Sequence, residues 1–166
     1  MLLTIILFIA SLSPQEGFSG MPKPAGCDFF TRQNASKIIG GEVTWTGTDS
    51  TESEPKKWTC TFVSNASAAG PKLHFGLRRF SSPEKARAEF DEIASSNKNH
   101  SGFEKWHGIG DDAIVHTDGP NFQFVMVLKG SRSFRIKVNP VGTTSLENVK
   151  AVAEDLVPKI EKLEAE

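Results

Sequence analysis

The chain has 166 residues, which is enough for one domain with a hydrophobic core and too few for two domains of ordinary size. Nineteen Lys and Arg residues oppose 20 Asp and Glu residues, so the surface as a whole has no surplus of positive charge to attract nucleic acid or an anionic membrane. The charged fraction of 23% and the hydrophobic fraction of 38% are typical of a globular protein and not of a disordered one.

Residues 2–13 form a predominantly apolar run at the N-terminus. Its length is that of a signal-peptide core and is too short to span a bilayer. Small residues suit cleavage before Gly20, so we expect a signal peptide over residues 1–19, a linker over residues 20–26 and no stable membrane insertion. No Lys or Arg precedes the run, which leaves an uncleaved anchor, or a true start at Met21, as alternatives.

Cys27 and Cys60 are the two cysteines of the chain. An even count in an exported chain predicts a disulfide, whereas two buried free thiols would be expected in a cytosolic chain. Closing a loop of about thirty residues stabilises a fold by about 3 to 4 kcal/mol. Together with the apolar run, the cysteine pair predicts a periplasmic or secreted protein.

A single domain is expected over residues 27–166, and it begins with a short helix. Thr31 can cap this helix, and the glycine pair that follows it supplies a left-handed end. Residues 42–46 have the pattern of a strand. The polar run over residues 47–57 predicts a loop.

Two alternating strands are predicted next. Trp58, Cys60 and Phe62 recur at every second position, which is the period of a strand with one buried face. Cys60 would then point inward, so a bridge to Cys27 would hold the first helix on that face. Residues 73–77 repeat the alternating pattern.

The clearest helix begins after Ser82, which is a favourable N-cap residue. Pro83 occupies the first helical position, where its missing N–H costs nothing, and Glu84 lies where the helix dipole favours a negative charge. This helix should pack on the sheet through an apolar stripe of Ala86, Phe90, Ile93 and Ala94.

The second half of the chain contains three strand patterns after a glycine-rich and acidic turn over residues 106–113. Residues 113–115 begin the first of these strands. Residues 122–129 are mostly apolar on both faces, which predicts a central position in the sheet. A two-residue turn then closes a hairpin with residues 133–138.

A long C-terminal helix completes the pattern. Thr144 and Glu147 have the spacing of a capping box, and an apolar stripe runs from Leu146 to Leu163. Consecutive strands with tight turns, and helices before, between and after them, predict an α+β domain. We expect a mainly antiparallel sheet of about six strands packed with three helices.

The turn before the second group of strands contains the residues that most resemble a site. Gly108 and Gly110 suggest a phosphate-binding loop, but Ala113 replaces the third glycine and the segment precedes a strand instead of a helix. A turn is the simpler interpretation.

Four potential metal ligands lie within ten residues of this region, namely His107, Asp111, Asp112 and His116. Their spacing matches no standard zinc or calcium pattern, and roles in turns or at strand ends explain them more simply. A metal-binding protein or metal-dependent enzyme using this segment is therefore an alternative hypothesis.

The last hairpin has a basic side formed by Arg132, Arg135 and Lys137, which Arg78 and Arg79 could extend. This strip could bind an anionic glycan, a lipid head group or an acidic partner, and a solvated outer face of the sheet is the competing interpretation. No serine lies in a G-x-S-x-G sequence, and two oxidised cysteines would provide no nucleophile. We therefore expect no enzymatic activity and no cofactor.

The chain resembles a group of small bacterial exported proteins of unknown function. The shared features are Cys27 before a short helix that ends in Gly40 and Gly41, Cys60 on an early strand, the Ser82 to Ser95 helix and the Gly108 to Ala113 turn before a strand. The group includes actinobacterial lipoproteins and the extracellular sensor domain of a mycobacterial serine/threonine kinase. The resemblance covers about residues 27 to 163 and implies a PsbP-like α+β fold that serves as an exported sensor, binding or envelope module. This chain lacks the lipoprotein cysteine and has one expected disulfide where the kinase sensor has more.

Export, a disulfide and the lack of a catalytic motif predict a non-enzymatic binding, sensor or interaction module. Its partner would be a protein, a glycan or a small ligand of the cell envelope, and not nucleic acid. A purely structural envelope component is a further alternative.

Overall fold

The computed structural model describes residues 27–28 and 30–162. The predicted signal peptide over residues 1–19 and the linker over residues 20–26 lie outside these residues. In chain order the elements are α1 (Arg32–Ile39), β1 (Val43–Thr51), β2 (Lys56–Ser64), β3 (Lys72–Arg79), α2 (Pro83–Asn97), β4 (Phe103–Trp106), β5 (Asp112–Asp118), β6 (Phe122–Lys129), β7 (Arg132–Asn139) and α3 (Leu146–Lys162).

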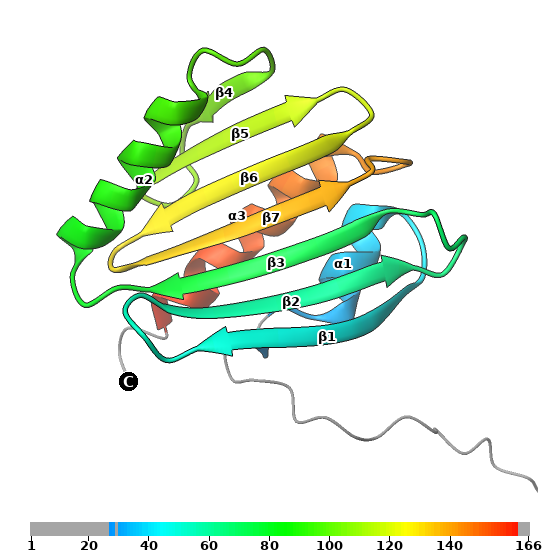
Figure 1. Ribbon diagram of the computed structural model, residues 1–166, viewed down its shortest axis with the longest axis horizontal. Coiled ribbons are helices and arrows are strands. Elements are labelled where there is room, and N and C mark those ends of the chain that lie inside the picture. Colours follow the sequence, from blue (N-terminus) through cyan, green and yellow to red (C-terminus); the bar gives the residue numbers. More distant parts are fainter. Residues whose placement is uncertain (1–26, 29, 163–166) are drawn as a thin grey trace, which may run out of the picture.

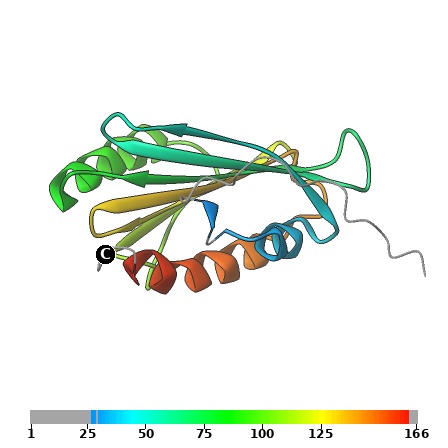
Figure 2. The same ribbon diagram turned by 90° about the horizontal axis from the view of Figure 1, so that it is seen from below.

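The strands form one antiparallel sheet with the order β1-β2-β3-β7-β6-β5-β4 (Figure 1). In the view of Figure 1, α1 and α3 lie behind the sheet and α2 lies in front of it, and Figure 2 shows the same layers from the side. We call the two surfaces of the sheet the back face and the front face. The predicted α+β class is confirmed, with seven strands where about six were expected.

The back face carries the larger hydrophobic core. Alternate residues of the strands pack there against α1 and α3, and β4 contributes the partly buried Trp106. Phe75 is fully buried and stacks on Phe30, with ring centroids 4.3 Å apart. Cys60 lies in the same core and is bonded to Cys27, with 6.2 Å between their Cα atoms. The predicted disulfide is therefore present, and it ties the segment before α1 to the back of the sheet.

The front face is covered only in part. Helix α2 begins at its predicted N-cap, because the Ser82 hydroxyl accepts a hydrogen bond from Lys85 N. Its buried residues form a second and smaller core with residues of β5 and β6, which comprises Phe80, Ala86, Phe90, Ala94, Ile114, Met126 and Leu128. No helix in the part of the chain that the structure describes is long and apolar enough to cross a membrane.

Two stretches differ from the sequence prediction. The polar run over residues 47–57 is not a loop throughout, since β1 continues to Thr51 and β2 begins at Lys56. The two strands pair along this stretch, with a bulge between Trp45 and Gly47. An edge strand needs backbone pairing on one side only, so polar side chains are no obstacle there. The additional strand β4 has only four residues and no alternating pattern that would have revealed it.

Candidate functional site

The front of β1, β2 and most of β3 has no helix over it among the described residues, as Figure 1 shows. The strand register brings two rows of side chains together on the front face. One row runs across β2, β3, β7, β6 and β5 as Thr61, His74, Lys137, Phe124 and His116. The neighbouring row contains Thr59, Gly76 and Arg135 on β2, β3 and β7.

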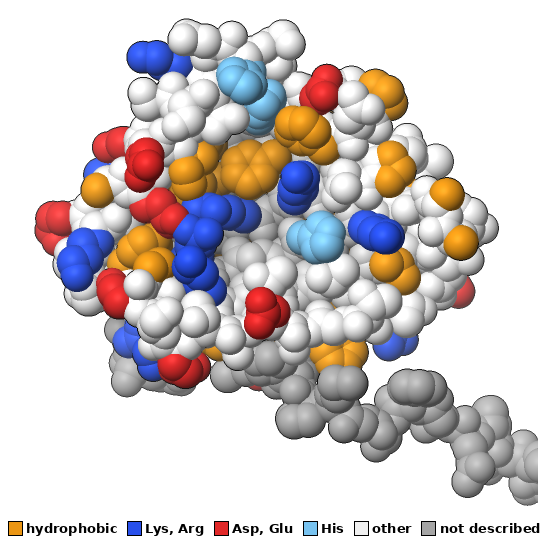
Figure 3. Space-filling view, viewed as in Figure 1, with side chains coloured by type: hydrophobic (Ala, Val, Ile, Leu, Met, Phe, Trp, Pro, Cys, Tyr) orange, Lys and Arg blue, Asp and Glu red, His pale blue; other side chains and the backbone are white. Residues whose placement is uncertain are grey.

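Gly76 has no side chain, so it leaves a gap in the second row, between Thr59 and Arg135. A Cβ atom built on Gly76 would meet only the Trp58 carbonyl oxygen, 3.9 Å away. Arg135 lies opposite Gly76 on β7, while His74 and Arg78 are its neighbours on the same face of β3. Figure 3 shows Lys, Arg and His side chains gathered around a recessed part of this face. We call this surface the Gly76 site.

Two arginines of the Gly76 site share one carboxylate. Glu89, which comes from α2, contacts Arg78 and also lies with Oε1 3.1 Å from Arg135 Nη2. Each of the three side chains is between 21% and 23% exposed. Burial, followed by the charge of Arg135, lowers the pKa of Arg78 to about 10, and burial also lowers the pKa of Arg135. Arginine stays protonated in proteins, so the two guanidinium groups carry two positive charges and Glu89 neutralises only one of them.

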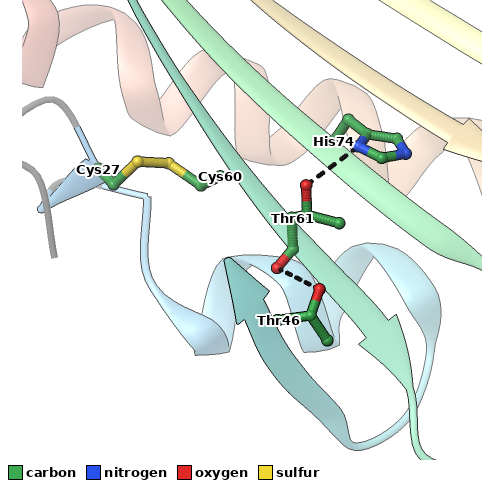
Figure 4. The surroundings of a disulfide bond; sticks show 5 residues. All are labelled: Cys27, Thr46, Cys60, Thr61 and His74. Atoms are coloured by element: carbon green, nitrogen blue, oxygen red, sulfur yellow. Dashed lines mark hydrogen bonds between the residues drawn. A yellow bond between two sulfur atoms is a disulfide. The ribbon is translucent and has the colours of Figure 1, made fainter. Parts of the chain in front are cut away.

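The other side of the Gly76 site is formed by His74 and Lys137. Thr61 Oγ1 lies 3.2 Å from His74 Nδ1, and Figure 4 shows this contact on the side of β2 that faces away from the disulfide. Burial, together with the charges of Lys137 and Lys72, lowers the pKa of His74. The lowered pKa favours the neutral form of the His74 imidazole.

The predicted basic strip is not one surface. Arg132 is only 3% exposed and lies on the back face, where it donates a hydrogen bond to the Ile160 carbonyl oxygen over 3.1 Å. Arg135 and Lys137 lie on the front face. Side chains alternate between faces along a strand, so the odd spacing between Arg132 and Arg135 separates them.

The aspartates of the alternative metal site have structural partners instead. Asp111 accepts a hydrogen bond of 2.7 Å from Gly130 N and lies 3.2 Å from Lys129 Nζ. Burial favours a higher pKa for Asp111, but these two partners outweigh it and hold the pKa below the usual value of 3.8. Asp112 pairs with Arg87 over 2.9 Å. These contacts support the interpretation of residues 106–113 as a structural turn.

The histidines of the same segment also diverge. His107 is exposed in the turn, whereas His116 lies on β5 with Nδ1 3.0 Å from Asn97 Oδ1. No three His, Cys, Asp or Glu side chains among residues 27–28 and 30–162 are arranged to hold a metal ion. The structure therefore does not bring the four predicted ligands together.

The structure reveals a pairing that the sequence did not indicate. His100, which lies in a polar loop, has its ring centroid 5.2 Å from that of His116, with the rings edge to face. A hollow of about 460 Å³ is lined by His100, Ser101, His116, Asp118 and Phe122. Glu89 was missed for a related reason, because only the packing of α2 on the sheet places it between two arginines.

Comparison of the chain with protein-family models, with curated proteins and with solved structures found no match. The resemblance to actinobacterial exported proteins therefore remains a prediction from sequence motifs.

Proposed function

We propose that the protein is an exported, non-enzymatic binding module whose Gly76 site binds a small organic anion. The observation that carries this proposal is the sharing of one carboxylate, Glu89, by Arg78 and Arg135 on the open front face. Lys137 lies beside them and is exposed. Three cationic side chains against one carboxylate leave a surplus of two positive charges at this site.

The position of these charges favours binding. They project from β3 and β7, which are paired on both sides within the sheet, so their backbone does not need to become ordered around a ligand. A unit charge about 4 Å from an opposite charge gains about 4 kcal/mol at an effective dielectric constant of about 20. Gly76 provides space at the centre, and an anionic group seated there would be within reach of side chains on both strands.

The side chains next to the Gly76 site also suggest that the ligand has an apolar part besides its anionic group. Phe124 and Phe122 are partly exposed next to the cations, and Lys137 Nζ lies 5.5 Å from the centroid of the Phe122 ring. An apolar body attached to the anionic group would cover these rings and remove apolar area from water. This arrangement favours an organic acid or ester over a free inorganic ion.

The same residues give little support to catalysis. Thr61 and His74 form a hydroxyl–imidazole contact of the kind that can activate a nucleophile. In such sites a carboxylate normally orients the histidine and stabilises its positive charge. His74 instead has Lys137 and Lys72 nearby, which disfavour its protonation. The contact between Thr61 and His74 is therefore better explained by a role in ligand binding than by catalysis.

Export is supported by two features. The Cys27–Cys60 disulfide suits an oxidising compartment, and the apolar run over residues 2–13 suits a signal peptide. A periplasmic or secreted location would give the site access to small ligands of the cell envelope.

NMR titration of the isotopically labelled protein tests the proposal. Inorganic phosphate serves as the minimal anion, followed by a panel of phosphate monoesters, sulfate esters and carboxylates with apolar bodies. We expect saturable shifts of the amides of Gly76, Arg135 and Lys137, and tighter binding of the organic anions. Lys137→Gln should weaken binding about tenfold, which corresponds to a loss of about 1.4 kcal/mol. Lys37→Gln on α1, behind the sheet, is the matched charge control.

A graded series at Gly76 separates binding from folding. Ala, Val and Leu at this position should weaken binding progressively, because each fills more of the gap. Stability should stay level or rise, since Gly76 has no positive φ and a side chain favours an extended strand. Gly47→Val on the edge strand, where a Cβ also has open space, is the matched control.

Three outcomes would contradict the proposal in different ways. Unchanged affinity in Gly76→Leu would place the ligand elsewhere. No saturable shift with any anion would favour a purely structural envelope component. Turnover of a broad hydrolase panel, lost on substitution of His107, Asp111 or His74, would show that the protein is an enzyme.

A further inference from the structure

The hollow at the other end of the front face has a different chemistry from the Gly76 site. It contains two imidazoles, from His100 and His116, together with the hydroxyl of Ser101 and the carboxylate of Asp118. His116 and Asp118 lie on the same face of β5 because they are two residues apart on one strand. His100 reaches them from the loop that precedes β4.

The hydrogen bonds of Asn97 define which nitrogen of His116 is free. Asn97 Nδ2 donates to the Ile93 carbonyl oxygen over 2.8 Å, so Asn97 Oδ1 is the atom that faces His116. An amide oxygen can only accept, which means that His116 Nδ1 carries the proton of this 3.0 Å hydrogen bond. In the neutral ring, Nε2 is then left with an available lone pair.

Such an arrangement is characteristic of histidines that bind metals. A metal-binding imidazole commonly donates its second N–H to a carbonyl or carboxylate oxygen, which fixes the tautomer and orients the ring. Asn97, the last residue of α2, provides the acceptor oxygen for His116. The edge-to-face contact of 5.2 Å places a second imidazole beside the first.

We propose that His100 and His116 form a binding site for a divalent transition-metal ion such as Cu²⁺ or Zn²⁺. Imidazole nitrogen is a favourable ligand for these ions, whereas Mg²⁺ and Ca²⁺ require more oxygen ligands. The hollow of about 460 Å³ leaves room for water or a small ligand at the remaining coordination positions.

Asp118 is a candidate for binding a water molecule that is coordinated to the metal ion. Its Oδ2 accepts a hydrogen bond of 3.0 Å from Asn121 Nδ2. The second carboxylate oxygen can therefore bind metal-coordinated water while the first is held. The two imidazoles and water molecules would then make up the inner coordination shell.

The proposed metal ligands differ from the groups proposed to bind the anion. The site uses none of Arg78, Arg135 and Lys137, although Phe122 borders both sites, and it differs from the metal site predicted from sequence. The predicted site required Asp111 and Asp112, which are engaged with Lys129 and Arg87. Only His116 is common to the two.

Isothermal titration of the untagged protein with CuCl₂ and ZnCl₂ tests the inference. We expect one equivalent of either ion to bind, with Cu²⁺ tighter than Zn²⁺, and no binding of Mg²⁺ or Ca²⁺. His100→Ala should weaken binding at least about tenfold. His100 is exposed, so this variant should keep the wild-type fold. His107→Ala and His74→Ala are matched controls that should leave the affinity unchanged.

Asn97 provides a test of positioning. Asn97→Ala should lower the metal affinity by about 10- to 100-fold, because His116 loses the partner that fixes its tautomer. Asn97→Asp keeps an acceptor oxygen and should restore the affinity. A purely structural role for Asn97 would not produce this rescue. Broadening of the His100 and His116 ring resonances by substoichiometric Cu²⁺ locates the ion directly.

The inference would be overturned by a lack of saturable binding of both ions. It would also be overturned by full affinity in His100→Ala, or by a loss of binding in His107→Ala with the resonances of His116 unaffected. None of these three results would bear on anion binding at the Gly76 site, which is measured separately without metal.

Discussion

The two faces of the sheet are built for different tasks. On the back face, α1 and α3 cover a continuous apolar core that is closed by a disulfide. On the front face, α2 covers a small apolar core, and the rest of the surface presents arginine, lysine and histidine. The back face therefore supplies most of the apolar burial, which is the main favourable term in folding.

The contrast between the two faces shows where this fold can accommodate like charges that lie close together. Two arginines around one carboxylate place like charges close together, and both guanidinium groups are desolvated. Such an arrangement lowers stability unless other contacts offset it. Because β3 and β7 contribute alternate residues to the back core, the same strands that carry these charges are held by apolar packing behind them.

Truncation of one large aromatic residue on each face would test this contrast most strongly. Phe75→Ala on the back face should lower the free energy of unfolding by about 4 to 5 kcal/mol, and Phe90→Ala on the front face by about 3 kcal/mol. Both side chains are fully buried. Phe75 is packed against Phe30 and Phe134, whereas Phe90 lies in a small core whose edges can relax. Urea denaturation followed by tryptophan fluorescence measures both, and an equal or larger loss for Phe90→Ala would refute the contrast.

Removal of the disulfide should have the next largest effect. The double variant Cys27→Ala, Cys60→Ala should lose about 3 to 4 kcal/mol, because the bridge closes a loop between residues 33 positions apart. Hydrogen exchange should show loss of protection first in α1, which is short and packs only on the back face. Wild-type protein treated with reductant is the control and should match the variant. A loss of protection that begins in α2 would contradict this expectation.

A single change at Glu89 should move stability and affinity in opposite directions. Glu89→Gln removes the shared counter-charge, so the two arginines repel each other and stability should fall by about 1 to 3 kcal/mol. The Gly76 site gains one net positive charge, so its affinity for phosphate should rise. Glu92→Gln on the exposed side of α2 is the control and should change neither quantity. Weaker phosphate binding by Glu89→Gln would indicate that Glu89 orients the arginines and does not merely neutralise them.

The smallest expected effect concerns the acid dependence of the turn before β5. The pKa of Asp111 is below its usual value in the folded protein, so its ionised form stabilises the fold above about pH 4, and this contribution is lost as the pH falls through the lowered value. Asp111→Asn should be less stable than wild type at pH 7. The difference should shrink between about pH 4 and about pH 2. Asp49→Asn, at an exposed position, is the control, and urea midpoints across this pH range give the measurement.

Much of the fold could be predicted because local signals and packing agree. Helix α1 has the expected N-cap at Thr31, and its C-cap Gly40 has a φ of 78°. The alternating apolar residues of β2 and β3 lie on the back face as predicted, and β6 is paired on both sides. These features depend on residues that are neighbours in sequence, which is why their pattern is visible there.

The remaining features depend on neighbours that are distant in sequence. The predicted N-cap Thr144 is not used, since α3 begins at Leu146 and Thr144 Oγ1 is buried without a hydrogen-bond partner. Arg132 was grouped with Arg135 by composition, although strand alternation places them on opposite faces. The contact of His100 with His116 and that of Glu89 with two arginines arise only when α2 and the loop before β4 pack on the sheet.

The edge strand β1 has one more consequence for the molecule at high protein concentration. The outer side of such a strand presents unpaired backbone groups, to which an extended segment of another chain could add. The bulge between Trp45 and Gly47 interrupts the regular spacing of these groups, and the exposed Asp49 and Ser50 side chains beyond it offer little apolar area to a second strand. The irregular polar stretch that hides the second half of β1 in the sequence thus discourages the sheet from growing into fibrils.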